Sequence, residues 1–221
     1  MVSAVSKEVE STRSPEQLSS ILRSRPLSEL VTPLLKADAK SFTNAPEFIS
    51  RNTTFFTTAI SRPPYTPINS DIPILSLHTA SAALTLVPNS HWAIETHKFN
   101  ISSYDGASTI LENTPPPGDA DFEKSRVAAD KKFKKELYHY LRWALSAGAP
   151  GPGIPETMVI LGREETVKRL AEARELTREA EAGLSPVAAR RAKERGAKAK
   201  QSVPDEAGQD RSWMGSLAPR G

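Results

Sequence analysis

Apolar residues recur at helical spacing in several stretches of the chain. The clearest short stretch is 27–35, where leucine and valine stand three or four positions apart and form one stripe. A longer stripe runs through residues 120–147, and its apolar members are Phe122, Phe133, Leu137, Tyr140, Leu141, Ala144 and Leu145. Residues 73–87 and 164–182 show the same period with smaller or fewer apolar side chains. The pattern predicts a mainly α-helical protein of short helices.

Local signals for helix ends agree with this period. The Ser-Pro-Glu-Gln run at 14–17 predicts a helix start with a capping box, because the serine and glutamine side chains can each accept a hydrogen bond from the other residue's backbone N–H. The Ala-Pro-Glu run at 45–47 predicts a second start. Gly148 is placed to end the long helix, since glycine readily adopts the left-handed conformation found there.

Residues 92–102 have a different pattern. Glu95, His97, Phe99 and Ile101 alternate with residues such as Ile94, and alternation with a period of two is typical of a strand. The fold class predicted is therefore mainly α, with short helices joined by Pro/Gly-rich linkers and one or two short strands allowed near 92–102. An extended basic C-terminal region follows.

Prolines and glycines are concentrated in connectors and divide the chain. Three consecutive prolines at 115–117 give the strongest boundary, because they can neither continue a helix nor donate backbone hydrogen bonds. The division predicted is 1–13 flexible N-terminus, 14–113 small helical domain, 114–119 linker, 120–147 long amphipathic helix, 148–155 linker, 156–200 charged helical extension and 201–221 disordered tail. The proline-rich run at 62–67 is either a rigid connector or a ligand for an aromatic groove.

Charge is distributed unevenly along the chain. Residues 1–121 hold 9 Lys/Arg and 12 Asp/Glu, whereas residues 122–221 hold 20 and 14, so the net charges are −3 and +6. The basic half is the one expected to meet an acidic partner.

Two groups of basic residues are candidate contacts for nucleic acid or another acidic partner. The first, on the long helix, is Lys131, Lys132, Lys134, Lys135 and Arg142; the second, near the C-terminus, is Arg190, Arg191, Lys193, Arg195, Lys198 and Lys200. Such residues bind phosphates by releasing counterions. The helix is alternatively a solvated amphipathic surface, and the C-terminal group is alternatively an import signal or a solubilising extension.

Common chemical signatures are missing from the sequence. Cysteine is absent, which excludes disulfides and thiolate ligands, and the four histidines lack the spacing of a metal site. The glycines at 148–153 are interrupted by prolines and lack the Lys-Ser/Thr of a phosphate loop. No apolar run reaches the length of a membrane span. The sequence therefore predicts no catalytic residue, metal, cofactor, small-molecule substrate or membrane span.

Short helices, proline-rich connectors and basic segments together are typical of auxiliary subunits of large complexes. The function predicted is a non-enzymatic structural subunit of a ribonucleoprotein, with the ribosome or mitochondrial ribosome as the concrete example. It would contact RNA backbone and neighbouring protein subunits through its basic C-terminal half. The alternative is a protein-only scaffold or adaptor. An intracellular location is expected, and the sequence fits the mitochondrial matrix, nucleus and cytosol equally.

Overall fold

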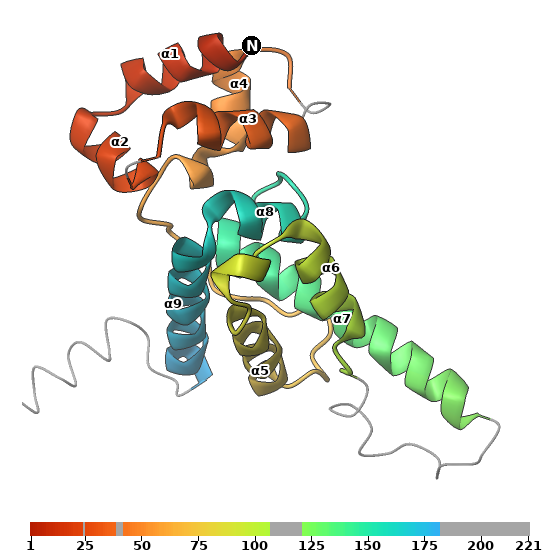
Figure 1. Cartoon of the computed structure of the whole chain (residues 1–221). Coiled ribbons are helices and arrows are strands. Elements are labelled where there is room, and N and C mark those ends of the chain that lie inside the picture. Colours follow the sequence, from red (N-terminus) through yellow and green to blue (C-terminus); the bar gives the residue numbers. More distant parts are fainter. Residues whose placement is uncertain (24, 39–41, 107–120, 182–221) are drawn as a thin grey trace, which may run out of the picture. The chain divides into compact units, whose positions relative to one another are not determined.

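The computed structural model describes residues 1–23, 25–38, 42–106 and 121–181 (Figure 1). Within these ranges the chain forms nine α-helices and two short 3-10 helices, without a strand. The predicted mainly α-helical class is confirmed. Residues 1–177 form one compact unit, and the few described residues after them belong to a second unit.

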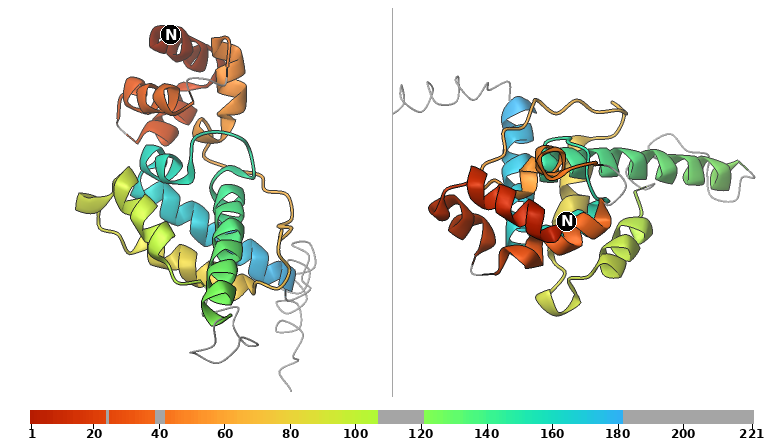
Figure 2. Two further views of the ribbon diagram at one scale, coloured as in Figure 1. Left: turned by 90° about the vertical axis from the view of Figure 1, so that its right-hand side faces the viewer. Right: turned by 90° about the horizontal axis from the view of Figure 1, so that it is seen from above.

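The N-terminal part of the unit contains four helices, α1 (Val2–Thr12), α2 (Pro15–Leu22), α3 (Leu27–Ala37) and α4 (Ala45–Arg51). Helix α1 packs against α3 and α4 (Figure 2). Val5 and Val9 of α1 are fully buried in this contact. The flexible N-terminus expected over 1–13 is therefore a packed helix, and two valines one turn apart supply its apolar side.

The predicted start of α2 is present in detail. The backbone N–H of Gln17 donates to Ser14 Oγ at 3.3 Å, and the backbone N–H of Ser14 donates to Gln17 Oε1 at 3.0 Å. The leucine stripe of α3 is also buried as its period predicts, and Pro33 lies inside this helix without splitting it. These elements are governed by interactions within one or two helical turns.

Residues 94–103 form a helix, so the strands allowed near 92–102 by alternation are wrong. Helix α6 (Ile94–Ser103) follows α5 (Ile74–Thr85) and packs against α8 (Ile154–Leu161). His97 and Ile101 are fully buried one turn apart, whereas Phe99 between them is 68% exposed. A strand would place all three on one face, so burial follows the helical period.

The long helix predicted over 120–147 is α7 (Phe122–Ser146), and α9 (Arg163–Glu181) matches the helix predicted over 164–182. Ala147 and Gly148 end α7 in the left-handed conformation, with φ of 54° and 81°. Helix α8 between them begins inside the predicted linker 148–155. It contacts α3, α6 and α7, so this apolar helix joins the N-terminal helices to the C-terminal ones.

A single hydrophobic core runs through the unit from Val5 to Ala173. Helix α7 packs in this core against α5 and α8, so residues 148–155 do not separate it as an independent body. The predicted linker 114–119, the part of the predicted extension from 182 to 200, and the predicted tail 201–221 lie outside the described residues.

Candidate nucleic-acid interface

One side of α7 is the core-facing side that its apolar period predicts. Phe133, Leu137, Tyr140 and Leu141 are each at most 1% exposed. Their burial fixes the rotation of the helix about its own axis. The basic residues between them therefore point in defined directions. Some are exposed without a carboxylate partner in the described ranges, some are paired with carboxylates, and Arg142 is partly buried.

Cations and one aromatic ring project from the side of α7 opposite the core. Lys131, Lys135, Tyr138 and Arg142 follow one another at intervals of four, three and four residues, so they share one stripe about 16 Å long. We call these four residues the outer stripe. Lys131 and Lys135 are exposed, and neither forms an ion pair with any residue in the described ranges.

Two of the predicted lysines are instead paired with carboxylates. Lys132 forms an ion pair with Asp71, which precedes α5, and Lys134 bonds to Asp130 one turn earlier at 2.5 Å. The hydrogen bond from Lys132 lowers the pKa of Asp71. Their charges are partly compensated within the chain, so these two lysines are weaker candidates for a partner's phosphates than their neighbours.

Arg142 lies at the C-terminal end of the outer stripe and is partly buried. Burial lowers the pKa of its guanidinium, while the charge of Glu156 in α8 acts in the opposite direction. The group stays charged, because the ordinary arginine pKa is far above neutral. The second predicted group, Arg190, Arg191, Lys193, Arg195, Lys198 and Lys200, lies outside the described residues.

A buried carboxylate on α7 holds a proline-rich segment, residues 62–69, against the helix. Glu136 is fully buried and accepts from the Tyr65 hydroxyl at 2.5 Å and from the backbone N–H of Ile68 at 3.1 Å. It also accepts from the backbone and side-chain nitrogens of Asn69 at 2.7 and 3.0 Å. Burial and the bond to Glu136 raise the pKa of Tyr65. Sequence analysis missed this anchor, whose only signal is a glutamate on the apolar side of the helix.

Other α7 side chains hold the same segment. The Trp143 indole donates to the Pro63 carbonyl at 2.8 Å, and the Tyr65 ring packs edge-on against Tyr140 with centroids 5.4 Å apart. His139 Nε2 lies 3.0 Å from the Thr66 carbonyl. The proline-rich run is therefore a connector, and the aromatic groove that it occupies belongs to its own chain.

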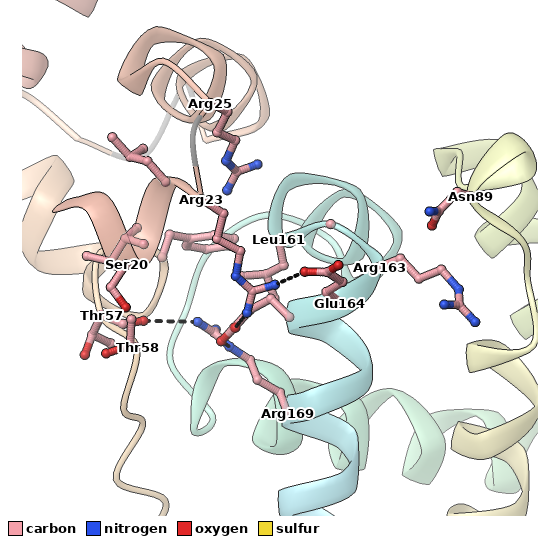
Figure 3. Close-up of a pocket in the computed structure, with 15 residues that line it drawn as sticks. Ser20, Arg23, Arg25, Thr57, Thr58, Asn89, Leu161, Arg163, Glu164 and Arg169 are labelled. Carbon is pink, nitrogen blue, oxygen red and sulfur yellow. Dashed lines mark hydrogen bonds and ion pairs between the residues drawn. The ribbon is translucent and has the colours of Figure 1, made fainter. Parts of the chain in front are cut away.

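A second cluster of cations surrounds a cavity of about 250 Å³ between α2, the segment after α4 and the start of α9 (Figure 3). At its mouth, Arg23 bonds to Glu164 and Glu165 at 2.8 Å each. Arg23 has a left-handed backbone, with φ of 48°, at the end of α2. Arg25, Arg163 and Arg169 also line the cavity.

Each of these arginines donates hydrogen bonds to protein acceptors. Arg25 donates to the Ile160 carbonyl, and Arg163 donates to the Thr85 and Val87 carbonyls. Arg169 bonds to Glu165 at 2.7 Å and to three backbone carbonyls, those of Thr54, Thr57 and Leu145. Burial lowers the pKa of Arg169. This cluster therefore connects helices, since each of its arginines is bonded to another part of the chain.

In the part of the chain that the structure describes, no group of three His, Asp or Glu side chains is placed to hold a metal ion. His97 is buried against Trp92, with ring centroids 4.3 Å apart, and neither of its nitrogens has a hydrogen-bond partner. Burial lowers its pKa. None of the described helices combines the length and the apolar character needed to cross a bilayer.

Comparison with known proteins gives one similarity. Residues 124–174 match the family described as the anticodon binding domain. The matched segment runs from the first turn of α7 through α8 into α9 and contains the outer stripe. It covers less than a quarter of the chain, so the similarity belongs to this segment. No curated protein and no solved structure matches the chain.

Proposed function

We propose that the protein binds RNA through the outer stripe of α7. The observation that carries this proposal is the coincidence of two features in one segment: exposed Lys131 and Lys135 without carboxylate partners, and similarity to an anticodon binding domain. Unpaired surface lysines keep their full charge for phosphates, and neutralising phosphates releases condensed counterions. Lys132 and Lys134, which already have carboxylate partners, are expected to contribute less.

The assembly we propose is a ribonucleoprotein in which this chain is a non-enzymatic structural subunit inside the cell, with the ribosome or mitochondrial ribosome as the concrete case. Two features support a structural role. A rigid helix held by the core on one side presents its other side without rearrangement. Cations on such a helix can contact phosphates regardless of base sequence, which suits a fixed position on a folded RNA.

The test is the salt dependence of RNA binding by the full-length chain. A labelled 12-nucleotide RNA is titrated with protein from 50 to 300 mM KCl, and affinity is read by fluorescence anisotropy. Each lysine that neutralises a phosphate of a single strand contributes about 0.7 to the slope of log affinity against log salt. We expect the double variant Lys131→Gln/Lys135→Gln to make this negative slope shallower by about 1.4.

Two matched variants make the result specific. Lys7→Gln/Lys36→Gln removes two exposed lysines from α1 and α3 and should leave the slope unchanged. Replacing the six basic residues from Arg190 to Lys200 by glutamine measures the share of that segment in the same chain. An unchanged slope for the α7 variant would contradict the proposed interface, and no binding at 50 mM KCl would contradict RNA binding as a whole.

A protein-only scaffold is the second candidate, and one observation favours it. Leu75 and Leu86, at the two ends of α5, are 70% and 79% exposed, and a protein partner that covered them would remove their apolar surface from water. Under this alternative, Leu75→Ala/Leu86→Ala would release partner subunits from the purified native complex, and nuclease treatment would not. Release by nuclease alone supports the ribonucleoprotein.

A further inference from the structure

Tyr138 differs from the other three tyrosines of the chain. Tyr65 and Tyr140 pack against each other, and Tyr104 stacks on Phe133 with centroids 5.7 Å apart. Tyr138 is 41% exposed, and in the described part of the chain its ring contacts no other aromatic ring and its hydroxyl makes no hydrogen bond. Aromatic contacts and hydrogen bonds among the described residues therefore do not account for an aromatic residue at this position.

Cations flank this ring along the helix. Lys135 lies three residues before Tyr138 and Arg142 four residues after it, so each is a direct neighbour on the helix surface, with Cβ atoms about 5–6 Å away. Lys131 extends the row by one more turn.

This arrangement has the components of a site for single-stranded nucleic acid. An exposed aromatic ring offers a face on which an unstacked base can pack, and cations on either side bind the adjoining phosphates. In an RNA duplex the bases are already stacked on one another, so a protein ring cannot replace that contact without opening the helix. The phosphates alone are available in both forms of RNA.

We infer that Tyr138 is the stacking platform for one unpaired RNA base, with Lys135 and Arg142 holding the phosphates on its two sides. This inference rests on the proposed RNA binding and specifies its ligand as an unpaired loop, bulge or single strand. It also assigns roles within the outer stripe: the lysines provide salt-dependent affinity, and the tyrosine provides discrimination between unpaired and paired RNA.

The experiment compares a 12-nucleotide oligouridylate with a 12-base-pair RNA duplex, each binding to the full-length protein by fluorescence anisotropy at 100 mM KCl. The duplex carries more phosphates, so attraction to phosphates alone would favour it. We expect the single strand to bind more tightly. We further expect Tyr138→Ala to weaken single-strand binding about 10-fold, the effect of losing one stacked base, and duplex binding less than 2-fold.

Two control variants separate stacking from other effects. Tyr138→Phe keeps the ring and should retain the affinity for the single strand. Phe99→Ala removes an exposed ring of α6 and should leave both affinities unchanged. Thermal unfolding should show that all three variants stay folded, because neither side chain belongs to the hydrophobic core.

Each of three other results would contradict a stated part of the proposal. If Tyr138→Ala binds the single strand normally while Lys131→Gln/Lys135→Gln does not, the stacking role is wrong and the proposed RNA interface stands. Tighter binding of the duplex would overturn the preference for unpaired bases. If neither RNA binds, the proposed function itself fails, and the inference fails with it.

Discussion

Two clusters of cations in this protein have opposite arrangements. The arginines around the cavity near α9 turn inward, and their donors meet two glutamates and several backbone carbonyls. Lys131 and Lys135 on α7 turn outward and meet no carboxylate in the described ranges. By charge alone both clusters would qualify as sites for an anion. Their hydrogen bonds differ: every arginine of the first cluster is bonded to protein acceptors, whereas Lys131 and Lys135 have no carboxylate partner in the described ranges.

The residue types suit these different tasks. A guanidinium presents several donors in a rigid plane, so Arg169 can satisfy Glu165 and three carbonyls at once in a nearly water-free position. An ammonium on a flexible stem is strongly hydrated and remains at the surface. Basic residues therefore indicate a ligand surface only when those already bonded to acceptors in the protein are left out of the count.

The largest effect is expected from Arg169→Ala. Its side chain is 3% exposed, and deletion removes one of the two arginines bonded to Glu165 and leaves the buried Leu145 carbonyl without its guanidinium donor. We expect a loss of about 3–5 kcal/mol in the free energy of unfolding, measured by urea titration. Lys168→Ala, at an exposed neighbouring position, should cost less than about 0.5 kcal/mol. Similar losses for the two variants would show that the inward arginine is not structural.

A smaller loss is expected from Glu136→Gln, the buried anchor on the same helix as the outer stripe. The amide can accept only part of the hydrogen bonds that the carboxylate receives from Tyr65, Ile68 and Asn69. The unfolding free energy should fall by about 1–3 kcal/mol. Proteolysis at the proline-rich segment should also become faster. A variant as stable and as resistant as the native protein would show that this segment is held by its aromatic contacts alone.

The pH dependence of stability should contain a contribution from His97. Burial lowers its pKa in the folded state, so the unfolded chain takes up the proton first. Stability should therefore be unaffected by this group above pH about 6.5 and should decrease as the pH falls below that value. Urea titrations at several pH values should show a shallower decrease for His97→Leu.

The smallest effect on stability is expected from Lys131→Gln/Lys135→Gln. Neither lysine has a carboxylate partner among the residues that the structure describes, so the melting temperature should stay within about 1 °C of the native value. Differential scanning fluorimetry would measure it in the same preparations used for RNA binding. A clear loss of stability would mean that these lysines support the fold, and the contrast with Arg169 would disappear.

Several elements of the fold were predictable from the sequence, because the interactions that form them lie within one or two turns. The capping box of Ser14 and Gln17, the leucine stripe of α3 and the left-handed end of α7 near Gly148 all involve residues at most eight positions apart. The apolar period of α7 also identified which side faces the core. Local spacing thus determined where most helices lie and which side of α7 is exposed.

Other features were decided by the tertiary structure. The alternation at 92–102 is typical of a strand, but residues 94–103 form helix α6, which packs against α8. Which cations are free depends on distant partners: Lys132 meets Asp71, Arg23 meets Glu164, and Arg169 meets Thr54. These partners are 61, 141 and 115 positions away. The order of residues specifies each charge, but only the packing of helices brings a charge to its partner or leaves it for a ligand.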